Sequence, residues 1–475
     1  MNRSIITCIA LLFAFVLLCP ITVHGQDGKA DRNEGLRERV RVMEAELNKL
    51  MKELEAMRAE LDADEKGGPA VEERPPADVK ADSRPEPVQE KLGVDLGKGI
   101  RLVPYGTVYF NAFGNSSGTN NTDVPLWATG DESSNLGMSL RQTRFGVRIE
   151  GGRLGGGTAT GTIEADFYGG LPDVGVGENF GVVRLRVAKL RIDWERSSVT
   201  FGQDWVVFAP RNPTSIAAAA IPQFAASGNL WSRLPQVRAA QRLAGGSVLV
   251  EAAVLAPTSG DFPQGPDSSF VLQPGAASRS LVPSLQTRAE FRESDWFNTG
   301  KPAAVAVSVH FGRTKVGDRG LASYGVAADW SVPITDRVGT TGELFYGKNL
   351  GGFQGGVFQG YNPDHVADPH ESSEGIPKAI ASRGGWVQLG YTPPILRDRL
   401  SIYGSVGIDD PDDNDLVNTS SRNFRSRNLS YAFNVIFKPI PNISVGGEFR
   451  RFETSYLLTG QKKAEHLNFG ASYSF

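Results

Sequence analysis

Seven arginines occur at alternate positions of segments that have the pattern of β-strands, and such spacing is suited to binding anions. They are Arg144, Arg148, Arg184, Arg186, Arg238, Arg242 and Arg288. Side chains two residues apart on a strand point to the same face. A guanidinium stays charged at physiological pH and donates hydrogen bonds to carboxylates and phosphates. If the seven side chains share one face, that face attracts anions.

A second interpretation of the arginines stays open, because acidic residues lie on the same faces. Glu150, Glu164, Asp166 and Glu290 alternate with apolar residues in the same strands. These acids can pair with the arginines and hold the strands together instead of leaving free positive charge. Arg288, two positions before Glu290, is the residue for which we most expect such pairing. We favour a net preference for anions, because the arginines gather on neighbouring strands.

The residues between the arginines are apolar and therefore belong to the opposite face. In the first of these strands Phe145 and Ile149 alternate with Arg144 and Arg148. In the strand that contains Arg184 and Arg186 the alternation changes phase. Val187 and the next residue, Ala188, are both expected on the apolar face. A β-bulge near Val187 is therefore predicted, because one extra residue reverses which side chains share a face.

About sixteen strand segments of this kind fill residues 100–475. They begin with Tyr105–Phe113 and end with a terminal strand from His466 to Phe475. Short connections such as Gly245-Gly246 alternate with mostly long ones, which is the arrangement of outer-membrane barrels. The predicted fold class is all-β: a 16-stranded antiparallel transmembrane β-barrel. A soluble β-sandwich is the alternative, but it has no reason to sort its loops by length.

The terminal strand carries an apolar row of Leu467, Phe469, Ala471, Tyr473 and Phe475. An apolar row that ends in two aromatic residues, opposite a polar row, is typical of a strand between lipid and water. It resembles the closing strand of bacterial outer-membrane barrels. We therefore interpret Tyr473 and Phe475 as the signal for the outer-membrane assembly machinery.

The N-terminal quarter of the chain divides into three segments. Residues 1–25 have a positive start, an apolar stretch and a small-residue cleavage site, which predict a signal peptide. The two cysteines, Cys8 and Cys19, lie within it. Residues 26–61 are predicted to form an α-helical coiled coil in the periplasm. Residues 62–99 are rich in proline and charge and form a linker.

The coiled coil is predicted from a heptad stripe that runs from Leu36 to Leu61. Its apolar residues recur at alternating spacings of four and three, and no position in the stripe is polar. A single helix of this length is marginal in water, so partner chains are expected, as in a homotrimer. The alternative is a helix that packs against its own domain.

The connection from Val206 to Leu234 differs from the other long loops because it is apolar. It contains no Asp or Glu, and its notable residues are Arg211, Phe224, Trp231 and Arg233. Surface loops are normally polar. We therefore expect this loop to fold into the lumen and to form its constriction. A contact between subunits is the alternative use of its apolar residues.

Composition excludes several other functions. The net charge of −3 argues against nucleic acid as a partner. No motif of a hydrolase, metalloprotease or phosphate-binding loop is present, so we nominate no catalytic residue, no cofactor and no enzymatic activity. No metal site is nominated either, because His365 and His370 are weak candidates as metal ligands.

The order of segments resembles that of the DcaP-like trimeric porins. Local matches are Leu140-Arg-Gln-Thr-Arg-Phe-Gly146, Arg184-Leu-Arg186 and Phe201-Gly-Gln-Asp-Trp205. The resemblance implies a homotrimer with periplasmic coiled coils and uptake of small anionic solutes, including dicarboxylates.

We expect an outer-membrane porin that forms a passive channel for small anionic solutes. Its expected surroundings are outer-membrane lipid and lipopolysaccharide, with the coiled coil in the periplasm. The alternative is a structural barrel that anchors a periplasmic coiled coil to the cell envelope.

Removal of residues 26–98 should leave a folded barrel, because the proline-rich linker separates the coiled coil from the strands. The folded fraction can be measured from the mobility shift of unheated samples in SDS gels. Loss of the folded band in the truncated chain would show that the division into domains is wrong.

Overall fold

The computed structural model describes residues 93–97, 99–131, 133–170, 181–259, 274–367 and 374–475. The chain divides into two compact units, Met1–Asp78 and Val79–Phe475, and all described residues belong to the second. The predicted signal peptide and coiled coil, and most of the predicted linker, lie outside the described residues. Within the described ranges, no helix is both long and apolar enough to cross a bilayer.

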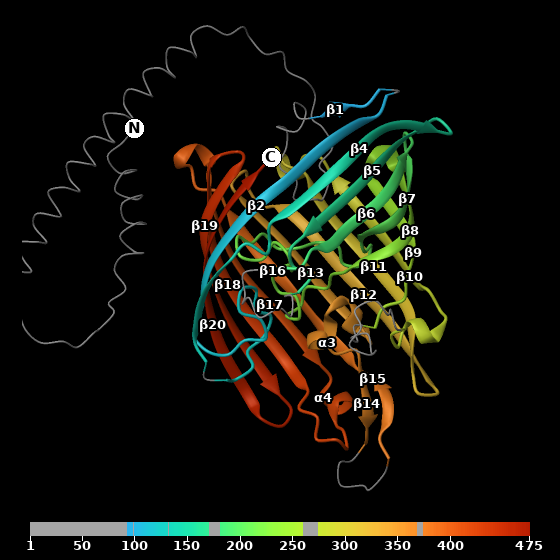
Figure 1. The fold of residues 1–475 in the computed structure, drawn as a ribbon, viewed down its shortest axis with the longest axis vertical. Coiled ribbons are helices and arrows are strands. Elements are labelled where there is room, and N and C mark those ends of the chain that lie inside the picture. Colours follow the sequence, from blue (N-terminus) through green and yellow to red (C-terminus); the bar gives the residue numbers. More distant parts are fainter. Residues whose placement is uncertain (1–92, 98, 132, 171–180, 260–273, 368–373) are drawn as a thin grey trace, which may run out of the picture. The chain divides into compact units, whose positions relative to one another are not determined.

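One antiparallel sheet of 18 strands forms the barrel, and it closes because β20 pairs with β2 (Figure 1). β1 is a two-residue strand that pairs with the first two residues of β2. β3 and β4 pair with consecutive parts of β2. With β1 left out and β3 counted with β4 as one interrupted strand, the barrel has 16 strands.

The strands of the sheet follow one another around the barrel in chain order. They are β1 (Val94–Asp95), β2 (Arg101–Asn115), β3 (Asn135–Ser139), β4 (Arg144–Leu154), β5 (Gly157–Asp166), β6 (Arg184–Asp193), β7 (Ser197–Trp205), β8 (Arg233–Leu243), β9 (Val248–Leu255), β10 (Ser284–Glu293), β11 (Ala303–Val316), β12 (Arg319–Pro333), β13 (Val338–Lys348), β16 (Ala381–Tyr391), β17 (Leu400–Pro411), β18 (Arg425–Ile440), β19 (Ile443–Tyr456) and β20 (Gly460–Ser474).

Shorter elements lie in the connections. They are the 3-10 turns η2 (Ala244–Gly246), η3 (Ser278–Ser280), η4 (Trp296–Asn298), η5 (Gly351–Phe353) and η6 (Leu396–Asp398), the helices α3 (Gly355–Phe358) and α4 (Asp413–Leu416), and a separate hairpin of β14 (Tyr361–His365) and β15 (Ile376–Ala379).

The prediction of a 16-stranded antiparallel barrel is confirmed, and each predicted segment overlaps one barrel strand. Long connections lie at one end of the barrel, called here the loop end, and short ones at the other, the turn end. Two loop-end connections, residues 317–318 and 457–459, are short. There the sequence predicted strands that end at Arg313 and Phe452, whereas the pairing continues through polar residues to the hairpin turns.

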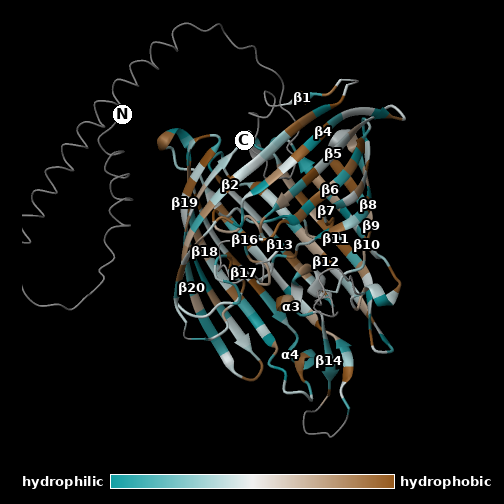
Figure 2. Cartoon of the chain, viewed as in Figure 1, coloured by the Kyte–Doolittle hydropathy of each residue, from teal (hydrophilic) through white to brown (hydrophobic). Residues whose placement is uncertain are grey.

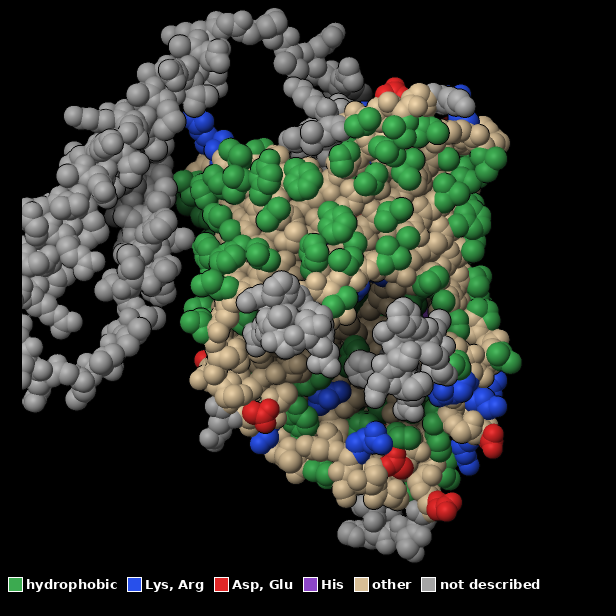
Figure 3. Space-filling model, viewed as in Figure 1, with side chains coloured by type: hydrophobic (Ala, Val, Ile, Leu, Met, Phe, Trp, Pro, Cys, Tyr) green, Lys and Arg blue, Asp and Glu red, His purple; other side chains and the backbone are tan. Residues whose placement is uncertain are grey.

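Hydrophilic and hydrophobic residues alternate along the strands (Figure 2). On β10, outward-facing Leu285 and Phe291 are 50% and 42% exposed, whereas inward-facing Arg288 and Glu290 are 4% and 1% exposed. Hydrophobic side chains cover much of the wall visible in Figure 3, and charged side chains gather toward the loop end. The outer face is therefore apolar over the middle of the barrel and charged at its loop end.

A β-bulge occurs on β6, as the sequence predicted. Glu164 pairs with Val187 and Ala165 pairs with Leu185, so Arg186 is the extra residue. The expected outward position of Val187 was wrong, because it lies opposite inward-facing Glu164 and is only 6% exposed. The bulge puts Arg186 and Val187, neighbours in the chain, both in buried positions.

The last residue completes the closure of the sheet. The Phe475 N–H donates to the Gly106 carbonyl at 3.0 Å, and the Gly106 N–H donates to the Phe475 carbonyl at 3.1 Å. The ring of Phe475 lies against Gly106, where an added Cβ would come within 2.7 Å of the ring. Tyr473 lies beside it, with ring centroids 6.3 Å apart.

Deletion of Phe475 should lower the yield of assembled barrel more than it changes the conductance of barrels that do assemble. The deletion removes two backbone hydrogen bonds and an aromatic ring from the closing seam, but it touches no lumen-facing side chain. Outer-membrane yield in cells and single-channel conductance measure the two effects. A Phe475→Tyr chain, which keeps the ring, serves as control; equal loss of yield in both chains would contradict the assembly role.

Candidate functional site: the barrel lumen

Loop 3, defined here as residues 206–232 between β7 and β8, lies inside the barrel. Its side chains Val207, Phe208, Phe224 and Leu230 are between 0% and 1% exposed. The first part of the loop packs with residues of several strands, including Phe345 of β13. The apolar composition of loop 3 therefore reflects burial within the lumen.

Wall glutamines hold the backbone of loop 3. Gln286 of β10 accepts hydrogen bonds from two N–H groups at the start of the loop, both at 3.0 Å. Gln388 of β16 exchanges two hydrogen bonds with Thr214, each of 2.9 Å. Gln142, which precedes β4, accepts hydrogen bonds from the backbone N–H groups of Ala219 and Ala220, at 2.7 and 2.9 Å. An irregular backbone buried in this way needs such partners, because unpaired polar groups are costly.

Two wall carboxylates complete the attachment of loop 3. Glu448 of β19 accepts hydrogen bonds from the Ser215 hydroxyl at 2.6 Å and from Gln223 at 2.8 Å. Glu343 of β13 accepts the Leu230 N–H at 3.1 Å. The acids that face the loop thus belong to the wall, while the loop supplies the donors.

Inward-facing glycines let the loop approach the wall closely. A Cβ at Gly407 of β17 would lie 2.4 Å from the Ser227 carbonyl oxygen. A Cβ at Gly470 of β20 would lie 2.7 Å from the Ile216 carbonyl oxygen. Any side chain at these two positions would move loop 3 away from the wall.

Arg184 and Arg186 lie in an ion-pair cluster on β5 and β6. Arg184 Nη2 is 2.7 Å from Asp166 Oδ2, and Arg186 contacts both Glu164 and Asp166 at 2.7 Å. Arg184 also donates to the Ala220 carbonyl of loop 3 at 3.0 Å. Arg184 therefore faces the loop as expected, and both predicted arginines are paired with acids.

Arg288 belongs to a second cluster, in which loop 3 takes part. Arg288 Nη2 is 2.6 Å from Glu290 and 2.7 Å from Asp329. Arg211 of loop 3 contacts the same two acids, at 3.1 and 2.5 Å. Arg292 also contacts Glu290. The expected pairing of Arg288 is present, and Arg211 fastens loop 3 to the wall.

Arg238 and Arg148 also have acidic partners. Arg238 lies 2.7 Å from Asp204, which Lys189 also contacts at 2.8 Å. Arg148 lies 2.7 Å from Glu150. Five of the seven predicted arginines are therefore paired with acids, which is the second of the two interpretations that the sequence left open.

Arg144 and Arg242 differ from the other five predicted arginines. Both are half-buried, and neither forms an ion pair with a described residue. Arg144 is the first residue of β4, and its cross-strand neighbours are Thr107 and Asp166. Asp166 already binds two other guanidinium groups. Arg144 therefore adds positive charge to the first cluster.

Arg233 stands where loop 3 meets β8 and interacts with aromatic rings. Its guanidinium lies 4.4 Å from the ring centre of Trp205 and 5.1 Å from that of Trp231. It donates one hydrogen bond of 3.3 Å to the Ala220 carbonyl. It forms no ion pair with the described acids, so it is a third cation without an acidic partner on this side. Phe224, the remaining predicted loop residue, packs against Trp386 and Ala432 on the opposite wall.

Loop 1, residues 116–134, also folds inward, which the sequence did not predict. The Ala128 N–H donates to Thr454 of β19 at 3.0 Å, and Asn428 of β18 donates to the Leu126 carbonyl at 2.9 Å. Trp127 lies beneath the guanidinium of Arg425 at 4.2 Å. The small apolar residues and asparagines of loop 1 do not distinguish a buried loop from an exposed one in the sequence.

Arg450 of β19 is fully buried beside Glu448, with 3.7 Å between Arg450 Nε and Glu448 Oε1. None of its three nitrogens donates a hydrogen bond to a described residue. Its ring neighbour is Phe452, 5.0 Å away. The inward position of Arg450 follows from strand alternation, but sequence analysis did not single it out.

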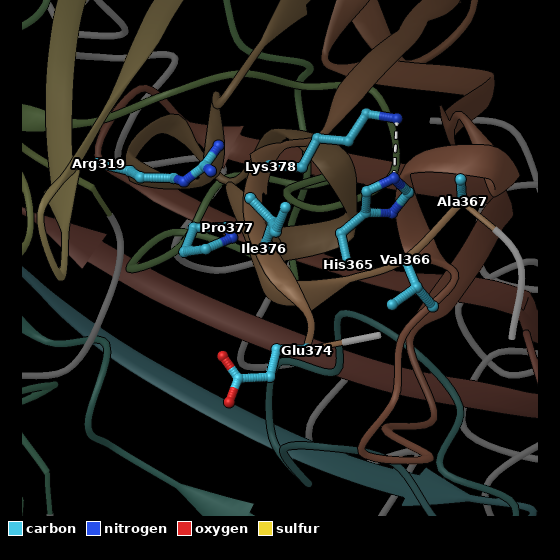
Figure 4. A pocket seen from close by; sticks show the side chains of 8 residues that line it. All are labelled: Arg319, His365, Val366, Ala367, Glu374, Ile376, Pro377 and Lys378. Carbon is cyan, nitrogen blue, oxygen red and sulfur yellow. Dashed lines mark hydrogen bonds between the residues drawn. The ribbon is translucent and has the colours of Figure 1, made fainter. Parts of the chain in front are cut away.

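A pocket of about 410 Å³ lies beside the β14–β15 hairpin (Figure 4). Lys378 donates to His365 Nε2 at 3.2 Å and pairs with Asp415 at 2.7 Å. The other ring nitrogen of His365 donates to the Val417 carbonyl at 3.1 Å. Both nitrogens are therefore occupied, and burial together with the Lys378 charge lowers the pKa of His365. The described residues include no group of three or more potential metal ligands.

Sequence reasoning located the lumen and loop 3, but it missed the residues that hold the loop. The carboxamides of Gln142, Gln286 and Gln388 lie at inward positions where the sequence shows isolated glutamines. An amide on a polar face has no distinctive spacing, so its partner in a distant loop is visible only in the fold. Arginine pairing was left open for the same reason.

No protein-family model matches the sequence, and no curated protein is significantly similar to it. Among solved structures, the outer-membrane channel DcaP of Acinetobacter baumannii matches with a TM-score of 0.60 and 19% identity, over 81% of this chain and 99% of that chain. An anion-selective porin from Comamonas acidovorans matches with a TM-score of 0.49 and 11% identity, over 79% of this chain and 100% of that chain. The suspected resemblance to DcaP is confirmed at the level of the fold, a closed barrel of 16 strands.

Proposed function

We propose that the protein is a passive outer-membrane channel for small solutes, with a preference for anions such as dicarboxylates. The observation that carries the proposal is the excess of arginine over acid where loop 3 meets β4–β8. There Glu164 and Asp166 form ion pairs with Arg184 and Arg186. Two more guanidinium groups, of Arg144 and Arg233, add charge that no described acid neutralises.

The composition of loop 3 supports the same preference. Residues 206–232 contain no acid, so the loop does not oppose the basic wall with negative charge. A solute in the lumen beside loop 3 therefore meets arginines of the wall and no acid of the loop. Weak screening in a narrow, partly dehydrated passage strengthens the effect of each unpaired charge.

The second cluster adds little to this preference. Arg211, Arg288 and Arg292 share Glu290 and Asp329, and Glu343 faces them from the neighbouring strand. Each of the three cations lies within ion-pair distance of an acid, so this part of the wall serves to fix loop 3. Selectivity is therefore assigned to the β4–β8 side.

The proposal places the barrel in the bacterial outer membrane, with lipopolysaccharide and lipid around it and a homotrimer as the assembled form. The apolar outer face supports the membrane setting, because alternating apolar residues at this density need lipid or a partner subunit to cover them. The trimer and the periplasmic coiled coil rest on the heptad stripe of the sequence.

Replacement Arg144→Gln should lower the anion-to-cation permeability ratio by roughly twofold, because an unpaired charge in the lumen acts on passing ions with little screening. Reversal potentials in planar bilayers under a potassium chloride gradient measure the ratio. Arg427→Gln, which removes an exposed cation of β18, is the matched control and should leave the ratio unchanged. Cation selectivity of the unmodified channel would refute the anion preference altogether.

Replacement Arg186→Ala should mainly destabilise the barrel, by about 3 kcal/mol, because it leaves half-buried Glu164 with no guanidinium in ion-pair contact and removes one of the two guanidinium partners of buried Asp166. Urea unfolding followed by tryptophan fluorescence measures the loss. Arg427→Ala should change the free energy of unfolding by less than about 0.5 kcal/mol, as expected for an exposed site. An Arg186→Ala barrel of full stability and altered selectivity would mean that Arg186 acts on ions and not on the fold.

A further inference from the structure

Three basic side chains on the outer face of the barrel have no acidic partner. They are Arg313 and Lys315 of β11 and Lys348 of β13. By alternation they continue the outward-facing rows of Val305, Val307 and Phe311 on β11 and of Leu344 and Tyr346 on β13. None of the three forms an ion pair or a side-chain hydrogen bond with a described residue. We call them the outer basic cluster.

The register brings the outer basic cluster into one patch. Lys348 pairs with Tyr324 of β12, and Tyr324 pairs with Phe311. Arg313 lies two residues beyond Phe311, toward the loop end. Two strand spacings separate β11 from β13, about 10 Å, a distance that long basic side chains can bridge from both sides. One phosphorylated headgroup is therefore within reach of all three.

The strand between the two basic rows leaves space for a ligand. Ala322 and Gly320 of β12 face outward beside Arg313 and Lys315. The Arg313 guanidinium lies against Gly320, where an added Cβ would come within 2.4 Å of Nη2. Small residues at both positions leave the cations accessible, and Arg313 and Lys315 are exposed.

Some outward-facing cations elsewhere at the loop end have acidic partners, although exposed Arg427 of β18 has none among the described residues. Arg383 of β16 pairs with Asp410 at 3.1 Å. Arg451 of β19 lies 3.0 Å from Glu453 and 3.2 Å from Glu465. The β11–β13 sector is set apart because it groups three cations without acidic partners in one patch.

Aromatic side chains lie directly beside the outer basic cluster, on its apolar side. Phe311, Tyr324 and Tyr346 are 57%, 37% and 51% exposed. Exposed aromatic residues between an apolar band and a charged rim mark the level of lipid headgroups in membrane barrels. Figure 3 shows hydrophobic side chains over the wall of the face in view and both basic and acidic side chains near the loop end.

We propose that the outer basic cluster binds the phosphate groups of a phosphorylated glycolipid headgroup, of the lipid A type, in the outer leaflet. The inference rests on the membrane setting of the proposed function, in which the long loops face outward. The acyl chains of such a lipid lie along Val305, Val307 and Leu344, and its phosphates reach the cations. Arginine offers paired donors to phosphate oxygens, and the two lysines add point charges.

The test is a titration of the purified full-length protein in detergent with bisphosphorylated lipid A, followed by native mass spectrometry. The unmodified protein should bind it at least tenfold more tightly than dephosphorylated lipid A. The triple variant Arg313→Gln, Lys315→Gln, Lys348→Gln should lose at least tenfold in affinity. Inorganic phosphate should fail to compete, because it lacks the acyl chains that contact the apolar rows.

The matched control is the triple variant Arg153→Gln, Arg196→Gln, Arg397→Gln, which removes three exposed cations at the turn end. It should bind lipid A as the unmodified protein does. Equal losses in both triple variants, unchanged binding in the first, or full competition by inorganic phosphate would each overturn the proposal. If the first triple variant fails to fold, Lys315→Gln alone should weaken binding about threefold, since this exposed residue makes no contact that folding needs.

The proposals of a lipid site and of a channel function can be refuted independently of each other. The outer basic cluster lies on the outer face, so its replacement should leave the reversal potential of reconstituted channels unchanged. A channel that conducts without anion preference but binds phosphorylated lipid through β11–β13 would refute the selectivity and keep the lipid site.

Discussion

The pairing of β20 with β2 is the contact on which the rest of the structure depends. It joins the two ends of the sheet through nine register pairs from Thr107–Ser474 to Asn115–His466, and the backbone of Phe475 extends the seam to Gly106. A closed sheet leaves no unpaired edge and encloses a space. Inside that space loop 3 can be buried, and outside it the apolar faces of the strands form one continuous surface.

Loop 3 and the barrel wall contribute different chemical groups to the lumen. Loop 3 supplies backbone donors and Arg211, and the wall supplies acceptors from Gln286, Gln388, Glu343 and Glu448. Because loop 3 has no acid, the carboxylates that pair with Arg184, Arg186 and Arg288 all come from the strands. The same wall therefore positions the loop and decides where positive charge is left over, and that remainder lies on the β4–β8 side.

The charges of the outer face follow a similar division. On β16–β20 Arg383 and Arg451 have acids on neighbouring strands, whereas exposed Arg427 has no acidic partner among the described residues. On β11–β13 the alternation that carries apolar residues through the middle of the barrel ends in cations without acids. A change of residue type along a single row thus marks the boundary between the apolar band and the level of charged headgroups.

The sequence by itself determined the sixteen strands, their faces, the bulge on β6 and the inward course of loop 3, because alternation and loop composition are local properties of the chain. It placed Arg144 and Arg186 on the same face, but it could not distinguish their roles. That distinction depends on which arginines the nearby acid binds. Asp166 lies opposite Arg144 in the strand register, but it forms ion pairs with Arg184 and Arg186. The burial of loop 1, the glutamines that hold loop 3 and the grouping of Arg313 with Lys348 likewise join residues far apart in the chain. Only the tertiary structure decides such contacts, because their energy depends on distances that residue spacing does not encode.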